Sequence, residues 1–252
     1  MARDLPRALP EVVVPLPGGA PHVVRITDGE KTRLLDDLAA RLAAGRGFAV
    51  ATVNLDHMVK LSDAVAFGAA YAAQTHVVAD GNPVTWLARL AGHEVELIPG
   101  SELVVPLAAR AAGAGVPVGL FGALPEALEG AAARLSEATP GLEVAARIAP
   151  PFGFDPEGAE ADRMLDRMAA SRARLWFLAL GAPKQELFAA RALARLPAAG
   201  FVSVGAGLDF LAGTQVRAPW LMRRLAAEWI WRVLQDPARL APRYARPERD
   251  DG

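Results

Sequence analysis

The sequence has no cysteine and few histidines. Disulfides, thiolate metal sites and cysteine nucleophiles are therefore excluded in this chain of 252 residues. Its four histidines are far apart and show no metal-ligand spacing; they are His22, His57, His76 and His93. We expect each to be a surface or structural residue, and we expect neither a metal ion nor any other cofactor.

Long hydrophobic runs and a strong net charge are also missing. No stretch approaches the roughly 18 uninterrupted apolar residues of a membrane span. Prolines interrupt the apolar core that a signal peptide needs, at Pro6, Pro10, Pro15 and Pro17. The formal net charge of −1 gives no overall field that would recruit nucleic acid. These absences predict a cytoplasmic protein with no nucleic-acid partner.

What the chain does have is a regular alternation of strand and helix patterns. The expected strands are 12–14, 23–26, 48–54, 76–79, 116–121, 142–148, 174–180 and 201–204. The expected helices are 28–44, capped by Asp28, and 62–74, 82–90, 125–138, 156–170 and 186–196. Such alternation is typical of parallel βαβ units, and it predicts a Rossmann-like α/β fold with a mostly parallel sheet flanked by helices.

One strand-to-helix turn stands out, in the sequence Gly181-Ala182-Pro183-Lys184-Gln185-Glu186. A continuous apolar strand precedes Gly181, and Pro183 suits the first helical position. The free N–H groups of a first helical turn favour anionic partners, and ligands bind at the carboxyl ends of parallel strands. The alternative is an ordinary turn in which the Lys-Gln-Glu side chains are solvated.

Other strand ends carry polar residues. Thr52 and Asn54 alternate with Val53, so their side chains share one face. Asp80 and Gly81 close the next strand, where a carboxylate within reach of a substrate hydroxyl would serve as a general base. The alternatives are that Asp80 only caps a helix or forms a turn, and that Thr52 and Asn54 only bond the neighbouring backbone.

Two segments are rich in glycine. Residues 119–122 end a strand before a helix but lack the Gly-x-Gly-x-x-Gly order, which makes them weak evidence for a dinucleotide site. Residues 205–213 contain Gly205, Gly207 and Asp209, and would shape a loop around a ribose or a base. A tight packing turn is the alternative for this second segment.

Taken together, these motifs resemble the WecG/TagA/CpsF family of bacterial glycosyltransferases. Their order and spacing carry the resemblance over roughly residues 10–245, in the elements 52–54, 80–81, 181–186, 205–213, 217–219 and 228–232. One departure is that Leu97 stands where many members have arginine. In the same segment Glu102 replaces an aspartate.

The resemblance implies an inverting transferase that uses a UDP-sugar of the N-acetylmannosamine, glucuronic acid or glucose type. The acceptor would be a polyprenyl-diphosphate-linked glycan at the cytoplasmic membrane face, in cell-envelope or exopolysaccharide synthesis. Asp80 matches the family's proposed general base. Thr52, which we group with it as catalytic, and Asn54 match residues that flank the acceptor or sugar, and Gln185 matches a glutamine that lines the nucleotide-sugar pocket.

The C-terminal region is basic, although the net charge of the whole chain is close to zero. Residues 217–249 hold eight arginines against three acids, and we divide the chain into a core, 1–216, and an appendage, 217–252. A helix over 220–235 would gather Trp220, Trp231, Arg223 and Arg224 on one side, a mixture typical of contact with anionic lipid. The alternative is a homo-oligomer that buries both faces of this helix.

Arginines of this tail also have a role that the resemblance implies. In the family such arginines are thought to fold over the active site and meet the diphosphate, and Arg232, Arg239 and Arg243 are the matching residues. A planar guanidinium suits this task because it binds phosphate oxygens bidentately.

Two other functions remain open at this point. A nicotinamide-dependent oxidoreductase is favoured only by the α/β alternation, and fold alone is weak support for a function. A non-catalytic protein that docks on membranes through its tail is the second.

Overall fold

The core of the protein is a parallel six-stranded sheet. A computed structural model of the chain describes residues 10–16 and 19–215. The strands lie in the order β4-β3-β8-β7-β5-β6, and every neighbouring pair is parallel. Their bounds are β3 Phe48–Val53, β4 His76–Ala79, β5 Val118–Gly122, β6 Val144–Ile148, β7 Leu175–Ala179 and β8 Gly200–Ser203. The predicted Rossmann-like α/β fold is confirmed.

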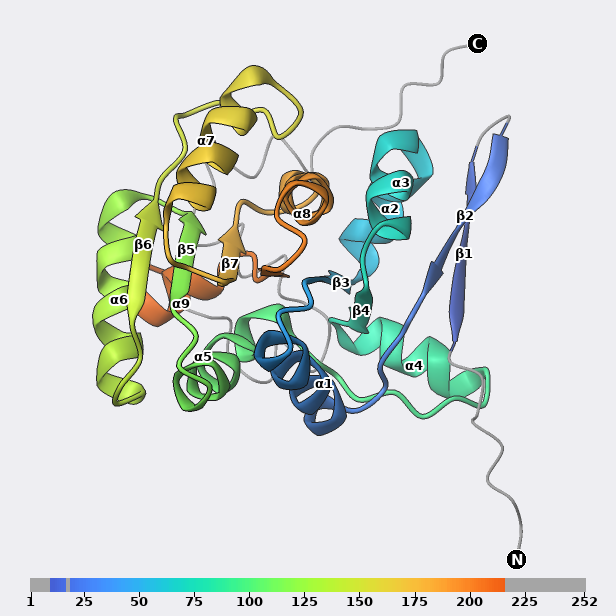
Figure 1. The fold of residues 1–252 in the computed structure, drawn as a ribbon. Helices are drawn as coiled ribbons and strands as arrows, with labels where there is room; N and C mark the ends of the chain where they lie inside the picture. The colour runs from blue at the N-terminus through green and yellow to red at the C-terminus, as the bar shows by residue number, and fades with distance from the viewer. Residues whose placement is uncertain (1–9, 17–18, 216–252) are drawn as a thin grey trace, which may run out of the picture. The chain divides into compact units, whose positions relative to one another are not determined.

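Helices cover both faces of this sheet (Figure 1). One face carries α1 Lys31–Ala43, α5 Val104–Gly113, α6 Pro125–Ala138 and α9 Gly207–Ala212. The other carries α3 Val65–Ala72, α7 Ala159–Ala170 and α8 Lys184–Arg195. Strand β7 shows why its sequence is a continuous apolar run, since Phe177 packs into the first layer and Trp176 into the second, both fully buried.

An antiparallel hairpin lies beside the sheet (Figure 1). Its strands are β1 Glu11–Leu16 and β2 Gly19–Arg25, longer than the sequence predicted, and they contact α3 and the helix α2, Leu55–Asp63. Val14 and Val24 from the hairpin pack with Phe67 of α3. The helix α4, Asn82–Leu90, completes this part of the core.

Several predicted boundaries and one predicted cap are wrong. The helix expected over 62–74 is α3, which begins only at Val65 because the backbone of Ala64 is extended; residues 62 and 63 end α2, a helix that was not predicted. Helix α5 was not predicted, and α9 occupies a segment expected to be a loop. Asp28 does not cap α1: the carboxylate of Glu96, distant in sequence, accepts from the Lys31 N–H at 2.7 Å, while Asp28 pairs with Arg33.

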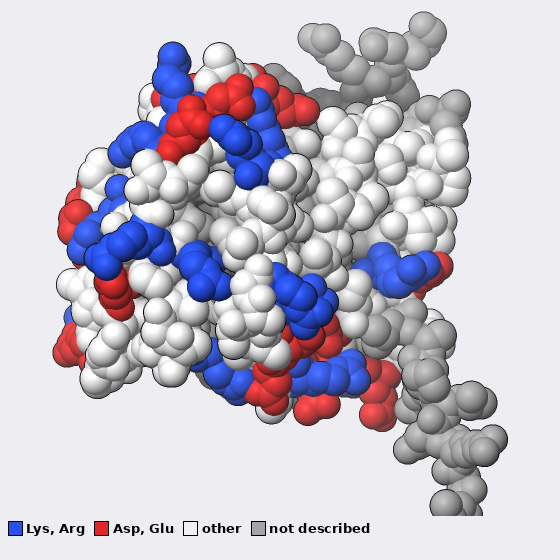
Figure 2. All heavy atoms as spheres, in the orientation of Figure 1, with Lys and Arg blue, Asp and Glu red and all other residues white. Residues whose placement is uncertain are grey.

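Charged side chains of both signs are mixed over the face shown in Figure 2, apart from an uncharged area over α3 and the upper part of the hairpin, whose lower end carries the ion pair of Arg25 and Glu11. No helix within the described ranges combines the length and the hydropathy that crossing a membrane requires. The predicted appendage, 217–252, lies outside the described residues. Its helix, its membrane contact and the domain boundary therefore remain predictions.

Candidate active site

The four motifs singled out in the sequence lie at one edge of the sheet. Because the strands are parallel, their carboxyl ends meet there, and β4, β3, β8 and β7 are consecutive neighbours. These four strands lead respectively into Asp80, Asn54, Gly205 and the turn at Gly181. Segments as far apart as Asn54 and Gly205 thus meet at one edge, as parallel topology requires.

The point where β3 meets β8 has the geometry of a ligand site. The chain after β3 continues into α2 and α3 on one face of the sheet, whereas the chain after β8 continues into α9 on the other. Ligands of open α/β sheets bind where neighbouring connections diverge in this way. We therefore centre the candidate active site on this edge.

Asp80 is held beside Asn54. Its backbone N–H donates to the carbonyl oxygen of Val53 at 2.9 Å, which ties the ends of β4 and β3 together. Gly81 follows with a φ of 129°, a backbone angle that residues with a side chain rarely adopt. A Cβ added at Gly81 would lie 3.5 Å from Asn54 Cβ. Asp80 is half-buried, and the N-cap of α4 is Gly81 rather than Asp80.

The side chain of Asn54 caps a helix. Its side-chain oxygen accepts a hydrogen bond from the His57 N–H at 3.1 Å, so it is the N-cap of α2. This is the backbone bonding that the sequence left open as an alternative. Thr52 is buried, and its methyl group lies against Gly100, where an added Cβ would approach it to 3.2 Å.

A buried polar cluster lies behind these strand ends. The Thr52 carbonyl oxygen accepts from the Tyr71 hydroxyl at 2.5 Å and lies 2.7 Å from His57 Nδ1, so that nitrogen must carry a proton to donate to it. Burial raises the pKa of the Tyr71 hydroxyl well above its usual range, and the carboxylates of Glu186, Asp80 and Asp56 raise it further. His57 and Tyr71 had no sequence signal beyond the expectation that His57 is structural, which the geometry confirms.

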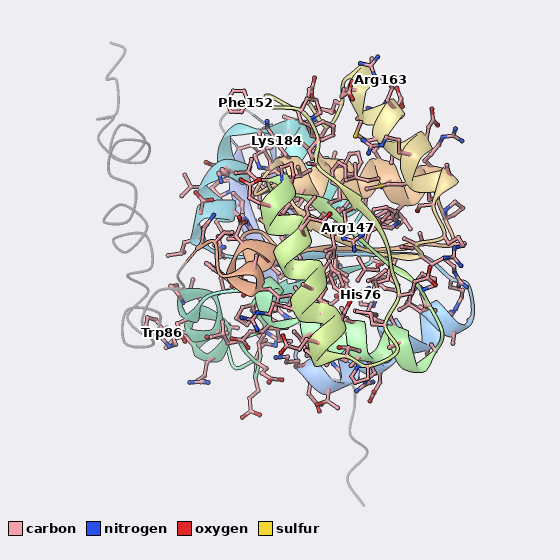
Figure 3. All side chains as sticks on the ribbon, turned by 90° about the vertical axis from the view of Figure 1, so that its left-hand side faces the viewer. His76, Trp86, Arg147, Phe152, Arg163 and Lys184 are labelled. Atoms are coloured by element: carbon pink, nitrogen blue, oxygen red, sulfur yellow. The ribbon has the colours of Figure 1, made fainter. Side chains whose placement is uncertain are left out.

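The turn at Gly181 is more deeply buried than either sequence interpretation allowed. Gln185 is 3% exposed and Glu186 is fully buried, so only Lys184 of the Lys-Gln-Glu group reaches solvent. The Gln185 side chain accepts from the Gly205 N–H at 3.1 Å and donates to Glu186 at 2.8 Å. Lys184, seen beside the loop of Phe152 in Figure 3, donates to the carbonyl oxygen of Phe154 at 2.7 Å.

Gln185 therefore joins the first turn of α8 to the turn at Gly205, and its predicted contact with a nucleotide-sugar remains a prediction. Burial raises the pKa of Glu186 to about 7, although the hydrogen bond from Gln185 and the charge of Lys60 lower it. The sequence predicted no role for Glu186 beyond its place in the first helical turn. A carboxyl group that titrates near neutrality inside the protein was not expected.

The glycine-rich segment after β8 combines packing with an open turn. Gly205 has a φ of +54° and nothing within 4 Å of an added Cβ, so its backbone conformation explains the glycine. Gly207 is needed for packing, because a Cβ there would lie 3.0 Å from Ser101 Cα. Helix α9 presents Asp209, half-buried, in its first turn.

The earlier glycine segment is explained by packing and, at Gly122, by a φ of 109° that favours glycine. A Cβ on Gly119 would lie 2.4 Å from the Trp176 ring, and one on Gly122 would lie 2.3 Å from the Ala179 carbonyl oxygen.

Glu102, from the segment that departs from the family pattern, pairs with Lys31 at 3.4 Å.

The three tail arginines that the sequence assigned to the diphosphate are outside the described residues. They are Arg232, Arg239 and Arg243. The structure therefore brings together the strand-end motifs and leaves the position of these arginines open.

Comparison with known protein families agrees with the motifs. The model of the glycosyl transferase WecG/TagA/CpsF family matches residues 22–248, from strand β2 through the four strand-end motifs and most of the tail. This chain therefore belongs to the WecG/TagA/CpsF family of glycosyl transferases, which act in the synthesis of cell-envelope polymers.

Proposed function

We propose that the protein transfers a sugar from a UDP-sugar to a polyprenyl-diphosphate-linked glycan, with inversion at the anomeric carbon. The donor would be of the N-acetylmannosamine, glucuronic acid or glucose type. The observation that carries this proposal is the meeting of Asp80, Asn54, Gly205 and the Gly181 turn on four neighbouring strands. It places a carboxylate and two glycine turns together at the edge where open parallel sheets bind ligands.

Asp80 is the general base in this proposal. Its carboxylate takes the proton of the acceptor hydroxyl while the hydroxyl oxygen bonds to the anomeric carbon of the donor. The bond from that carbon to the UDP oxygen breaks, and UDP leaves with the bonding electrons. A single displacement of this kind inverts the anomeric carbon, and Thr52 and Asn54 flank the reacting groups.

The leaving diphosphate needs positive charge. We assign this to Arg232, Arg239 and Arg243 of the tail, whose planar forks suit phosphate oxygens. The proposal includes no obligatory metal. The same basic segment, 217–249, would hold the protein on the anionic inner face of the cell membrane, where a lipid-linked acceptor is found.

Thermal unfolding with a nucleotide panel tests the donor class. We expect UDP and at least one UDP-sugar to raise the melting temperature, because a ligand that binds only the native state stabilises it, by about 2.7 kcal/mol at a hundred times Kd. NAD should have no effect. A shift with NAD and none with UDP would favour the oxidoreductase alternative instead.

A pair of substitutions separates the two roles of Asn54. Asn54→Ala removes the N-cap of α2 and should destabilise the protein by about 1 kcal/mol. Asn54→Asp keeps a capping oxygen, so its stability should be close to that of the wild type, but it replaces the amide with a carboxylate. If Asn54 contacts substrate, Asn54→Asp will lose sugar transfer at nearly full stability; full activity would limit Asn54 to capping.

A further inference from the structure

The amide of Gln185 connects the first turn of α8 with the turn at Gly205. Its oxygen accepts from the Gly205 N–H, and its nitrogen donates to Glu186 Oε1. Gln185 follows β7 and Gly205 follows β8, so this amide links the ends of neighbouring strands. Both side chains in the link are buried, which removes water as a competing partner.

The direction of these bonds depends on Glu186. A backbone N–H only donates, so the amide must present its oxygen to Gly205. Its nitrogen then needs an acceptor on the opposite side, and a carboxyl oxygen supplies one. Without that acceptor the buried amide nitrogen would be unsatisfied, at a cost of about 1–3 kcal/mol, and the amide would gain by turning away from Gly205.

Glu186 is itself held in place from its other side. Gln74 of the α3 C-terminal end donates to the Glu186 carbonyl oxygen at 3.1 Å and to the Ala70 carbonyl oxygen at 2.9 Å. The charged and titratable groups that act on the Glu186 carboxyl are Lys60 and Asp56 of α2, and Glu186 acts in turn on Tyr71. Lys60 also donates to the Ala182 carbonyl oxygen at 3.1 Å, in the same turn.

We propose that Glu186 is a positioning residue: it fixes the Gln185 amide, and through it holds the turn at Gly205, a loop that leads into α9, in the conformation that receives the donor nucleotide. The part about the donor rests on the proposed function. The part about the loop rests only on the hydrogen bonds and the burial described above. Glu186 does not touch substrate in this proposal.

Hydrogen exchange at the Gly205 amide tests the loop directly. In Glu186→Ala this amide should exchange about tenfold faster, since loss of one hydrogen bond is worth up to about 1.5 kcal/mol. Glu186→Gln should restore slow exchange, because the new side-chain oxygen accepts the same bond. Glu126→Ala, an exposed glutamate in the first turn of α6, is the matched control and should leave the Gly205 amide unchanged.

A second pair of variants keeps the test decisive if Glu186→Ala does not fold. Gln185→Glu places two carboxyl groups against each other and should speed exchange at Gly205. In the double variant Gln185→Glu, Glu186→Gln, the residue at 186 supplies the amide donor and the residue at 185 supplies the carboxylate acceptor. The Gly205 amide should therefore exchange slowly again. If the double variant is no slower than Gln185→Glu, or if Glu186→Ala folds and keeps the wild-type exchange rate, the proposal is overturned.

Binding of UDP separates this proposal from the proposed function. We expect Glu186→Ala to bind UDP about tenfold more weakly and Glu186→Gln to bind it as the wild type does. If the wild type does not bind UDP, the proposed function fails while the exchange data still decide the role of Glu186. If Glu186→Ala exchanges faster at Gly205 but binds UDP normally, the donor part is refuted.

Discussion

Asp80→Asn should lower the rate of UDP release by about 100-fold to 10,000-fold, the usual contribution of a general base. Asparagine has nearly the same shape but cannot accept the proton of the acceptor hydroxyl. The fold should be preserved, because the contact that ties β4 to β3 is made by the backbone N–H of residue 80. The measurement is UDP release with a UDP-sugar and a lipid-diphosphate acceptor, alongside thermal unfolding of both proteins.

A neighbouring carboxylate gives the control for this result. Asp56 lies on α2, is largely exposed and pairs with Lys60. Asp56→Asn also removes a negative charge, from the first turn of the helix that follows Asn54, but Asp56 is not the proposed base, so it should change the rate far less than Asp80→Asn. Equal losses in the two variants would point to a general charge effect, and a fully active Asp80→Asn would refute Asp80 as the base.

Glu186→Gln should stabilise the protein at alkaline pH and change its stability little at acidic pH. Glu186 is fully buried, its Oε2 atom has no hydrogen-bond partner among the described residues, and burial raises its pKa from 4.5 to about 7. Between these pKa values the native state binds a proton that the unfolded state has lost. The stability of the wild type therefore falls as pH rises through this window, by about 3 kcal/mol in all.

Glutamine has no such titration, so the difference between the two proteins isolates Glu186. The free energy of unfolding of Glu186→Gln minus that of the wild type should grow by about 2–3 kcal/mol from pH 5 to pH 8. Urea denaturation at a series of pH values measures it. A difference that stays constant from pH 5 to pH 8 would show that Glu186 does not titrate there.

The strands and the edge where the site lies follow from simple patterns. The run Leu175–Leu178 is apolar without interruption because β7 is covered on both faces. Once strands and helices alternate, parallel topology places every strand-end motif at one edge. Asp80 and Asn54 could thus be placed at the same edge of the sheet from the sequence alone, without knowledge of the strand order.

What the sequence could not predict depends on contacts between distant segments. Glu96 takes the capping role expected of Asp28, although 65 residues separate it from Lys31. Helix α5 lacks a side-chain cap, and its Pro106 obscures the helical pattern. Glutamate is normally a surface residue, and the burial of Glu186 was not predictable from its own segment. Gln185 finds its partner Gly205 only after the chain has returned through β8, and Gln74, from the end of α3, bonds the Glu186 carbonyl oxygen.

The proposed activity of the protein is sugar transfer from a UDP-sugar to a lipid-diphosphate-linked acceptor, at a site on this edge of the sheet. The most direct measurement incubates the full chain with labelled UDP-sugars and a polyprenyl-diphosphate-linked sugar, and quantifies both products. We predict that, with one of the UDP-sugars, label enters the lipid fraction mole for mole with UDP released, and that the new linkage is inverted relative to the donor. Absence of transfer from every UDP-sugar, or a linkage with the donor's own configuration, would contradict the account.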